Sequence, residues 1–290
     1  MAHLQNEHTQ MNLTDRSKNP GNTKVRKSIE NYRQHFGINQ EVRYAALSIA
    51  PDPRVCPSSK IAQCADPCLH FSGLARTYSS IIKARVRKLN FWLNDRPAFL
   101  KILRHELGLF EKLCLDTGVE GWVRLNVLSD IDWENFDIPQ NFPTLNFLDY
   151  TKRPDRITGD LPDNYRLIFS YSGAPRYKKH VETAVENNAP IAIVIDKMPT
   201  GAFHFLGRSE WIDGDQSDMV NCFQTGKNIY VFWEMYTNGD KIELMSGEGE
   251  IPADPTPFEL ALEKAIKEDA RKRREQKRNR AIQSGGGGGY

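Results

Sequence analysis

Three cysteines lie close together in one proline-rich stretch of the chain, residues 45–73. Cys56, Cys64 and Cys68 are separated by seven and then three residues. A short apolar run at 45–50 comes just before them, and a long helical pattern begins soon after. Thiolates are soft ligands, so three of them on one loop suit zinc or an iron–sulfur cluster. The alternative, three unrelated buried thiols, fits the surrounding prolines and polar residues less well. The spacing therefore predicts a metal or cluster site at the end of a strand.

Composition limits the class of protein. The 290 residues fit one large α/β domain or two small domains. No apolar run approaches the roughly 18 residues of a membrane-spanning helix, so we expect no membrane association. The N-terminus has no apolar segment typical of a secretion signal. Because three of the five cysteines are clustered, metal ligation in a reducing cytoplasm is favoured over a disulfide framework.

Four segments differ in texture. Residues 1–40 are polar and predict a disordered N-terminal arm. Residues 41–252 predict an α/β domain that carries the cysteine loop. Residues 253–283 predict a basic C-terminal helix, and 284–290 a flexible tail.

Helical periodicity runs from 76 to 115, as one long helix or two. Asp95 and Pro97 indicate a break, with Asp95 as the N-cap of a second helix and Pro97 in its first turn. Gly118 follows the expected end of that helix. The first half has a basic face that includes Arg85 and Lys88, which is either a solvated surface or a nucleic-acid contact.

After residue 120 the chain changes to short apolar runs separated by turns or helices. The runs lie at 122–128, 144–148, 166–170, 191–195 and 229–235, and the spacer 174–188 fits a crossover helix. Nearly continuous apolar runs are typical of buried parallel strands. With 45–50 they give about six mostly parallel strands. We therefore expect an α/β fold, either a partial or irregular α/β barrel or an open doubly wound sheet.

Polar side chains follow most of these runs, where ligands bind in α/β folds. Asp149 and Lys152 are candidates for an ion pair or a proton-transfer pair, and Asp213 for an acid or base. A capping role is the alternative for each aspartate. The remaining candidates for lining a cofactor pocket are Asp130, Ser170, Ser172 and Asp215.

Two further patterns suggest ligands. His70 would complete a zinc site of three cysteines and one histidine. Residues 271–280 carry seven positive charges in ten positions, which suits phosphate backbones or, equally, a solubilising tail.

The order of several motifs resembles the bacteriophage "gene product 88" family. The motifs are VCPSSKIAQCADPCLHFSG, NDRPAF, VRLNVLSDIDWE, LNFLDYTKR, LIFSYSGA and WIDGDQSD, and the likeness covers residues 22–235. It implies a phage or prophage source and does not imply a reaction, because the family is largely uncharacterised.

A weaker resemblance is to radical S-adenosylmethionine enzymes, in which a three-cysteine loop follows the first strand of a partial α/β barrel. It implies that Cys56, Cys64 and Cys68 hold three irons of a [4Fe–4S] cluster. S-adenosylmethionine would then bind the fourth iron. Strand-end residues such as Asp130, Asp149, Ser170 and Ser172 would line the pocket. The usual cysteine spacing is shorter than here, and no glycine-rich turn follows the second strand.

Two hypotheses for function are favoured over a third, a cluster-free group-transfer enzyme that uses Asp149 or Asp213. The first is an iron–sulfur enzyme, similar to radical S-adenosylmethionine enzymes, that acts on a nucleotide or nucleic acid in the host cytoplasm. The second is a zinc-stabilised protein without catalysis that binds nucleic acid or a host protein. The sequence does not indicate the oligomeric state.

Overall fold

Parallel strands that follow one another in chain order form the centre of the protein. The computed structural model describes residues 13–17, 23–65, 68, 70, 75, 78–195 and 205–232. In these residues one eight-stranded sheet has the order β1-β2-β3-β4-β5-β6-β8-β7, and β1 is its antiparallel strand. The strands are β1 (Thr14–Asp15), β2 (Val42–Ala46), β3 (Glu120–Arg124), β4 (Leu145–Thr151), β5 (Tyr165–Ser170), β6 (Ile191–Ile195), β7 (Trp211–Asp213) and β8 (Asn228–Phe232).

The strand order confirms the predicted α/β class and defines its type. From β2 to β6 each strand pairs with the next strand in the chain, as in a segment of a barrel. In a doubly wound sheet, by contrast, the strand order would reverse at a switch point. The sheet is open, because β1 and β7 occupy opposite edges. The structure is therefore not a closed barrel.

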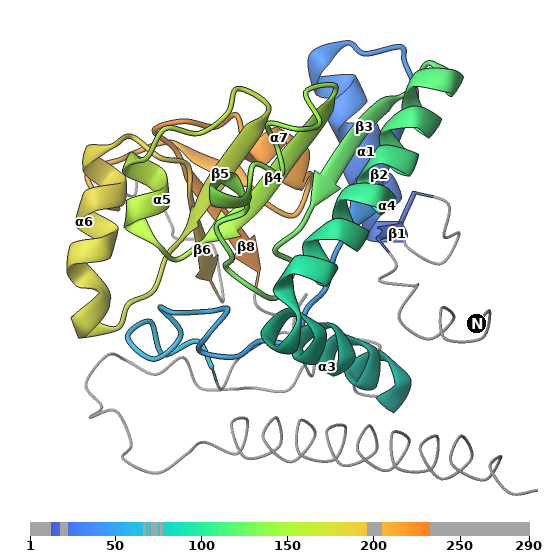
Figure 1. The fold of residues 1–290 in the computed structure, drawn as a ribbon. Helices are drawn as coiled ribbons and strands as arrows, with labels where there is room; N and C mark the ends of the chain where they lie inside the picture. Colours follow the sequence, from blue (N-terminus) through green and yellow to red (C-terminus); the bar gives the residue numbers. More distant parts are fainter. Residues whose placement is uncertain are drawn as a thin grey trace, which may run out of the picture.

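Helices cover both faces of the sheet (Figure 1). They are α1 (Thr23–Phe36), α3 (Ser79–Asn94), α4 (Arg96–Thr117), α5 (Pro154–Thr158), α6 (Lys178–Glu186) and α7 (Asp218–Asn221), with 3-10 helices η2 (Trp133–Phe136) and η3 (Pro175–Tyr177). In the described part of the chain, none of the helices combines the length and apolar character needed to span a bilayer.

Alternate residues of each strand pack against different helices. Val123 and Phe147 belong to one core with Leu89 of α3 and Leu103 of α4. Their neighbours on the same strands, such as Trp122 and Leu148, belong to a second core with Tyr32 of α1 and Met219 of α7. Side chains alternate along a strand, so these are the two faces of the sheet. A third core joins α6 to β5 and β6.

The break between α3 and α4 lies where the sequence predicts it. The Asp95 carboxylate accepts a hydrogen bond from the Ala98 N–H at 3.1 Å, and Pro97 lies in the first turn of α4. Gly118 ends the helix with a left-handed φ of 64°, which glycine adopts without steric cost. Both helix signals are confirmed.

The predicted disordered arm is wrong for residues 23–36, which form α1. The helix is polar overall, but Val25, Ile29 and Tyr32 recur on one side and pack on the sheet. Tyr32 lies edge-on to Trp122 with ring centroids 5.2 Å apart. The predicted basic helix at 253–283 and the tail at 284–290 lie outside the described residues.

We predict that two glycine-to-alanine substitutions have opposite effects on stability. A Cβ at Gly214 would lie 2.7 Å from the Tyr230 carbonyl oxygen and 2.6 Å from Ile229 Cγ2. Gly214→Ala should therefore lower the free energy of unfolding by about 1–3 kcal/mol. A Cβ at Gly108, within α4, would meet only Phe142 at 3.9 Å. Gly108→Ala should raise the free energy of unfolding by up to about 1 kcal/mol. Urea unfolding measures both, and equal effects would contradict this packing.

Candidate functional site

The cysteine loop crosses the edge of the sheet where the parallel strands end. In Figure 1 the pale blue loop after β2 runs beneath the tips of β6 and β8. The Asp130 N–H donates to the Val55 carbonyl at 2.7 Å, and the Cys56 thiol donates to the Leu128 carbonyl at 3.4 Å. Ser172 Oγ, after β5, donates to the Ala62 carbonyl at 2.7 Å. The loop is thus attached to the segments that follow β3 and β5.

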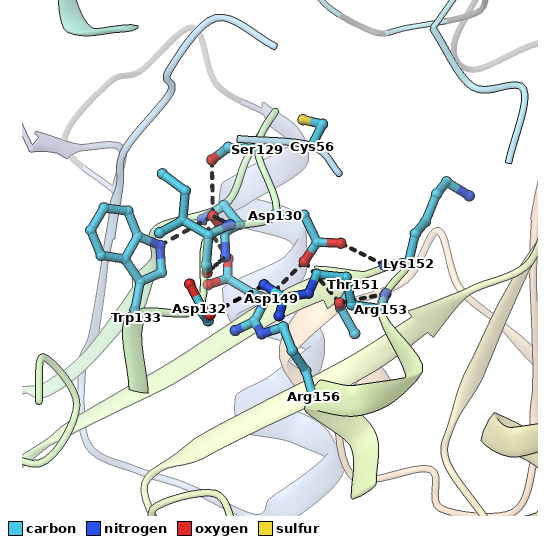
Figure 2. Close-up of polar contacts among 12 residues, drawn as sticks. Cys56, Ser129, Asp130, Asp132, Trp133, Asp149, Thr151, Lys152, Arg153 and Arg156 are labelled. Atoms are coloured by element: carbon cyan, nitrogen blue, oxygen red, sulfur yellow. Dashed lines mark hydrogen bonds and ion pairs between the residues drawn. The ribbon is translucent and has the colours of Figure 1, made fainter. Parts of the chain in front are cut away.

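Asn126 organises the turn after β3. Its Oδ1 accepts hydrogen bonds from Ser129 Oγ, the Ile131 N–H and Trp133 Nε1 at 2.9–3.1 Å. Its Nδ2 donates to the Ile131 carbonyl at 2.8 Å. A buried amide with this many partners fixes a loop without regular secondary structure. The turn therefore presents Asp130 in one defined position (Figure 2).

Asp130 is the centre of a buried ionic network. Its Oδ1 accepts from Thr151 Oγ1 at 2.8 Å and Arg156 Nη1 at 2.9 Å, and its Oδ2 accepts from the Lys152 N–H at 2.8 Å. Arg156 also forms a bidentate salt bridge with Glu134, with Nε–Oε1 at 2.8 Å and Nη2–Oε2 at 2.9 Å. Burial lowers the pKa of Arg156, but Tyr165, Glu134 and Asp130 raise it above its usual value on balance. Asp130 thus joins the ends of β3 and β4 to α5.

Asp149 lies beneath this network and is fully buried. Its Oδ1 accepts from the Asn126 N–H at 2.6 Å, and its Oδ2 accepts from the Tyr165 hydroxyl at 2.7 Å. Burial raises the pKa of Asp149 to about 7, although Arg156 and the two hydrogen bonds lower it. Its hydrogen-bond partners therefore come from the segment after β3 and from β5. A catalytic role for Asp149 remains a prediction.

Lys152 leaves β4 with its side chain directed away from Asp130, as Figure 2 shows. Its Nζ donates to the Ser170 carbonyl, Ser170 Oγ and the Tyr171 carbonyl at 3.2–3.3 Å. Burial lowers the pKa of the amine, and Cys64 and Asp130 raise it. The three acceptors are neutral, so they hold the amine in place without fully balancing its charge. The pKa of the amine therefore lies below its usual value.

The three thiols influence one another. Burial raises the pKa of Cys56, and the charges of Asp130, Cys68 and Cys64 add to the shift. Burial likewise raises the pKa of Cys64, while Lys152 lowers it. The pKa of Cys68 rises to about 11 through burial, while Arg85 lowers it. Without a metal the thiols are therefore protonated near neutral pH.

The thiols do not surround one point closely. Within the ranges that the structure describes, no three histidine, cysteine or acidic side chains form a set that could hold a metal ion. His70, the predicted fourth zinc ligand, is completely buried, and its carbonyl accepts from Arg85 Nη1 at 2.6 Å. A preformed cage for a single ion is therefore not present in this part of the chain.

The remaining predicted residues divide into two places. Ser170 and Ser172 lie beside Lys152 and the thiol loop, as expected for one pocket. Asp213 ends β7 and Asp215 follows it; Asp213 Oδ1 accepts from the Asp215 N–H at 2.9 Å, and Asp215 pairs with Lys24 of α1 at 3.4 Å. The structure therefore groups Asp130, Lys152 and the two serines with the thiols and does not group Asp213 and Asp215 with them.

Sequence reasoning missed Arg156, Glu134 and Asn126. Glu134 lies four residues after Asp130, and Arg156 follows Pro154 at the start of α5. The pair of acidic residues and the helix start are visible in the sequence. Their pairing across 22 or 26 residues is not, because it depends on the parallel register of β4 with β3.

Comparison with known proteins identifies one family. The model of the family described as "Gene product 88" matches residues 11–238, which is most of the chain. No curated protein matches. No solved structure matches.

We predict that Asp149 makes stability depend on pH. Its pKa is raised from 3.8 to about 7 by burial, so the folded state holds this proton more tightly than the unfolded state. Its stabilising contribution is complete below pH about 4 and is lost as the pH rises through about 7. The slope is at most about 1.4 kcal/mol per pH unit. Asp149→Asn should remove this slope.

Urea unfolding at about pH 5 and about pH 8 tests this expectation. Asp163→Asn, at an exposed aspartate, is the control. Relative to wild type, Asp149→Asn should gain stability between the two pH values, and Asp163→Asn should not. Parallel behaviour of the two variants would contradict a raised pKa for Asp149.

We predict that Arg156 and Arg153 differ strongly in their effect on stability. The Arg156 side chain is 1% exposed, and its partners Asp130 and Glu134 are 9% and 11% exposed. Arg156→Met leaves two buried carboxylates without their cation and should cost about 3–5 kcal/mol. Arg153 is itself 21% exposed and pairs with Asp155 and Asp132, which are 61% and 27% exposed. Arg153→Met should therefore cost less than about 1 kcal/mol. Chemical denaturation of both variants measures the difference, and similar losses would exclude Asp130 as the structural centre.

Proposed function

The chain belongs to the Gene product 88 family, and we propose that it is an iron–sulfur enzyme that acts on a nucleotide or nucleic acid. The observation that carries the proposal is the position of Cys56, Cys64 and Cys68. They lie on one loop at the carboxyl edge of a parallel sheet, next to Asp130 and Lys152. Ligands of open α/β sheets bind at this edge.

Three thiols on one loop are a donor set that an iron–sulfur cluster can use, since each thiolate would bind a different iron. The thiols here lie close enough together to shift one another's pKa. Lys152 beside Cys64 and Arg85 beside Cys68 favour the thiolate forms that iron requires.

The protein's own residues have separable tasks in this proposal. Asp130 and its hydrogen-bond partners fix the segment to which the thiol loop is attached. Cys56, Cys64 and Cys68 would hold three irons. The Lys152 amine, held by Ser170, would position a polar group of the substrate or exchange a proton with it. When bound, a cluster of this kind would supply electrons singly, and S-adenosylmethionine would be the co-substrate.

The state of the cysteines supports a reducing compartment. All five are free thiols in the structure, and Cys114 and Cys222 are buried. Proteins of the cytoplasm keep their thiols reduced. We propose that the protein is a bacteriophage product that acts in the cytoplasm of a bacterial host.

We predict that protein purified without oxygen contains about four irons and four sulfides per chain and absorbs visible light. The triple variant Cys56→Ala/Cys64→Ala/Cys68→Ala should lose all three signals. Cys114→Ala, which removes a buried thiol from α4, is the matched control and should keep them. Metal analysis, sulfide analysis and a visible spectrum make the measurement.

The outcomes separate the hypotheses. One zinc per chain without colour would replace the enzyme by the zinc-stabilised binding protein. Absence of both metals would leave the thiols as structural groups and refute the proposal.

A further inference from the structure

Three cations meet beside the thiol loop, at the start of the segment that follows β2. Arg16 follows the edge strand β1, and its Nη2 donates to Ser48 Oγ at 3.1 Å. Arg85 and Lys88 lie about one turn apart on α3, and the Arg85 carbonyl accepts from the Ala50 N–H at 3.2 Å. All three side chains are half-buried. The Arg16 guanidinium and the backbone of Arg85 therefore both contact residues 48–50, and Lys88 follows Arg85 by about one helical turn.

Among the residues that the structure describes, no carboxylate forms an ion pair with these three cations. Within the described ranges the two guanidinium groups donate to neutral oxygens, Ser48 Oγ and the His70 carbonyl. Glu106 of α4 raises the pKa of Lys88 by its negative charge. Its carboxylate also accepts a hydrogen bond from the Leu13 N–H at 2.8 Å.

The cations repel one another. Burial lowers the pKa of Lys88 to about 8, and Arg87, Arg85 and Arg16 lower it further against the opposing effect of Glu106. Burial also lowers the pKa of Arg16 and Arg85, and in each a neighbouring arginine contributes. Half-buried cations without counter-charges cost stability. A bound anion would offset this cost.

We propose that Arg16, Arg85 and Lys88 form a binding site for a phosphate group. Two planar guanidinium forks and one ammonium match the oxygens of phosphate, which accept several charge-assisted hydrogen bonds at once. The inference rests on the proposed function only where it assigns this phosphate to the substrate. Arg85 links the two sites, since it contacts the His70 carbonyl and acts on Cys68.

The position defines how the substrate is held. The phosphate lies on the β2 side of the thiol loop, whereas Lys152 and Ser170 lie on the β4 and β5 side. A nucleotide bound by its phosphate at the first place would extend along the carboxyl edge towards the second. The site thus specifies a phosphate-bearing substrate, free or within a strand.

The test uses the full chain and thermal unfolding in inorganic phosphate, compared with sodium chloride of equal ionic strength. Lys88→Met removes a charge that makes no hydrogen bond or ion pair with described residues, so the variant should fold. Lys83→Met, at an exposed lysine of the same helix, is the matched control. Phosphate should raise Tm of wild type and Lys83→Met beyond the salt effect and should not raise Tm of Lys88→Met. Without phosphate, Lys88→Met should be at least as stable as wild type.

Binding titrations then identify the source of the phosphate. Adenosine monophosphate and a short single-stranded oligodeoxynucleotide are titrated by calorimetry into the same three proteins. Lys88→Met should lower the affinity for the preferred ligand by about tenfold or more, which corresponds to the loss of one charge-assisted hydrogen bond. Lys83→Met should change the affinity little. Tighter binding of the mononucleotide indicates a free nucleotide, and tighter binding of the oligonucleotide indicates a strand.

Two results would contradict the proposed phosphate site. No phosphate stabilisation beyond salt in wild type, or equal losses in Lys83→Met and Lys88→Met, would overturn the site. Iron and sulfide are measured on Lys88→Met, and phosphate binding is repeated on wild type stripped of metal. Phosphate binding without iron would reject the iron–sulfur proposal alone. Iron without phosphate binding would reject the anion site alone.

Discussion

The carboxylate of Asp130 is the interaction on which the carboxyl edge of the sheet depends. A buried charge is tolerated only when hydrogen bonds and a counter-ion replace water. Asp130 obtains both from Thr151, Lys152 and Arg156, and these donors come from the end of β4 and from α5. Its own N–H binds the Val55 carbonyl, one residue before Cys56. One residue therefore sets the position of the thiol loop relative to two strands.

The charges around the thiols explain how such a loop could be loaded. Burial keeps all three thiols protonated in the ligand-free protein, and the negative charge of Asp130 raises the pKa of Cys56 further. Lys152 and Arg85 act in the opposite direction on Cys64 and Cys68. Metal binding must therefore displace protons, and it gains from cations that are already in place. The same Arg85 faces the proposed phosphate site, so metal and substrate would share one electrostatic environment.

The sequence predicted the parts of the fold that depend on local signals. Apolar runs located the central strands, and the run at 191–195 coincides with β6. Asp95 and Gly118 marked the ends of α4 because capping is a local interaction. The sequence could not predict β1 and β7, which span two and three residues and exist only through pairing with a neighbouring strand. It also assigned α1 to a disordered arm, because its polar composition concealed a narrow apolar side.

The site shows the same division. Asp130, Lys152, Ser170 and Ser172 follow strands in the sequence, and parallel strands end at one edge of a sheet. The sequence could therefore predict that they lie near the thiol loop. The same rule could not reveal that Asp149 is fully buried and bonded to the Asn126 N–H and the Tyr165 hydroxyl. Nor could it find Arg156, whose partners are chosen by the register of separate strands.

Anomalous diffraction at the iron absorption edge, from crystals grown without oxygen, tests the central proposal most directly. An iron–sulfur centre held by the loop predicts anomalous density within bonding distance of Cys56, Cys64 and Cys68 Sγ, above Asp130 and beside Lys152. Three protonated thiols without anomalous density, or iron bound elsewhere on the chain, would contradict it.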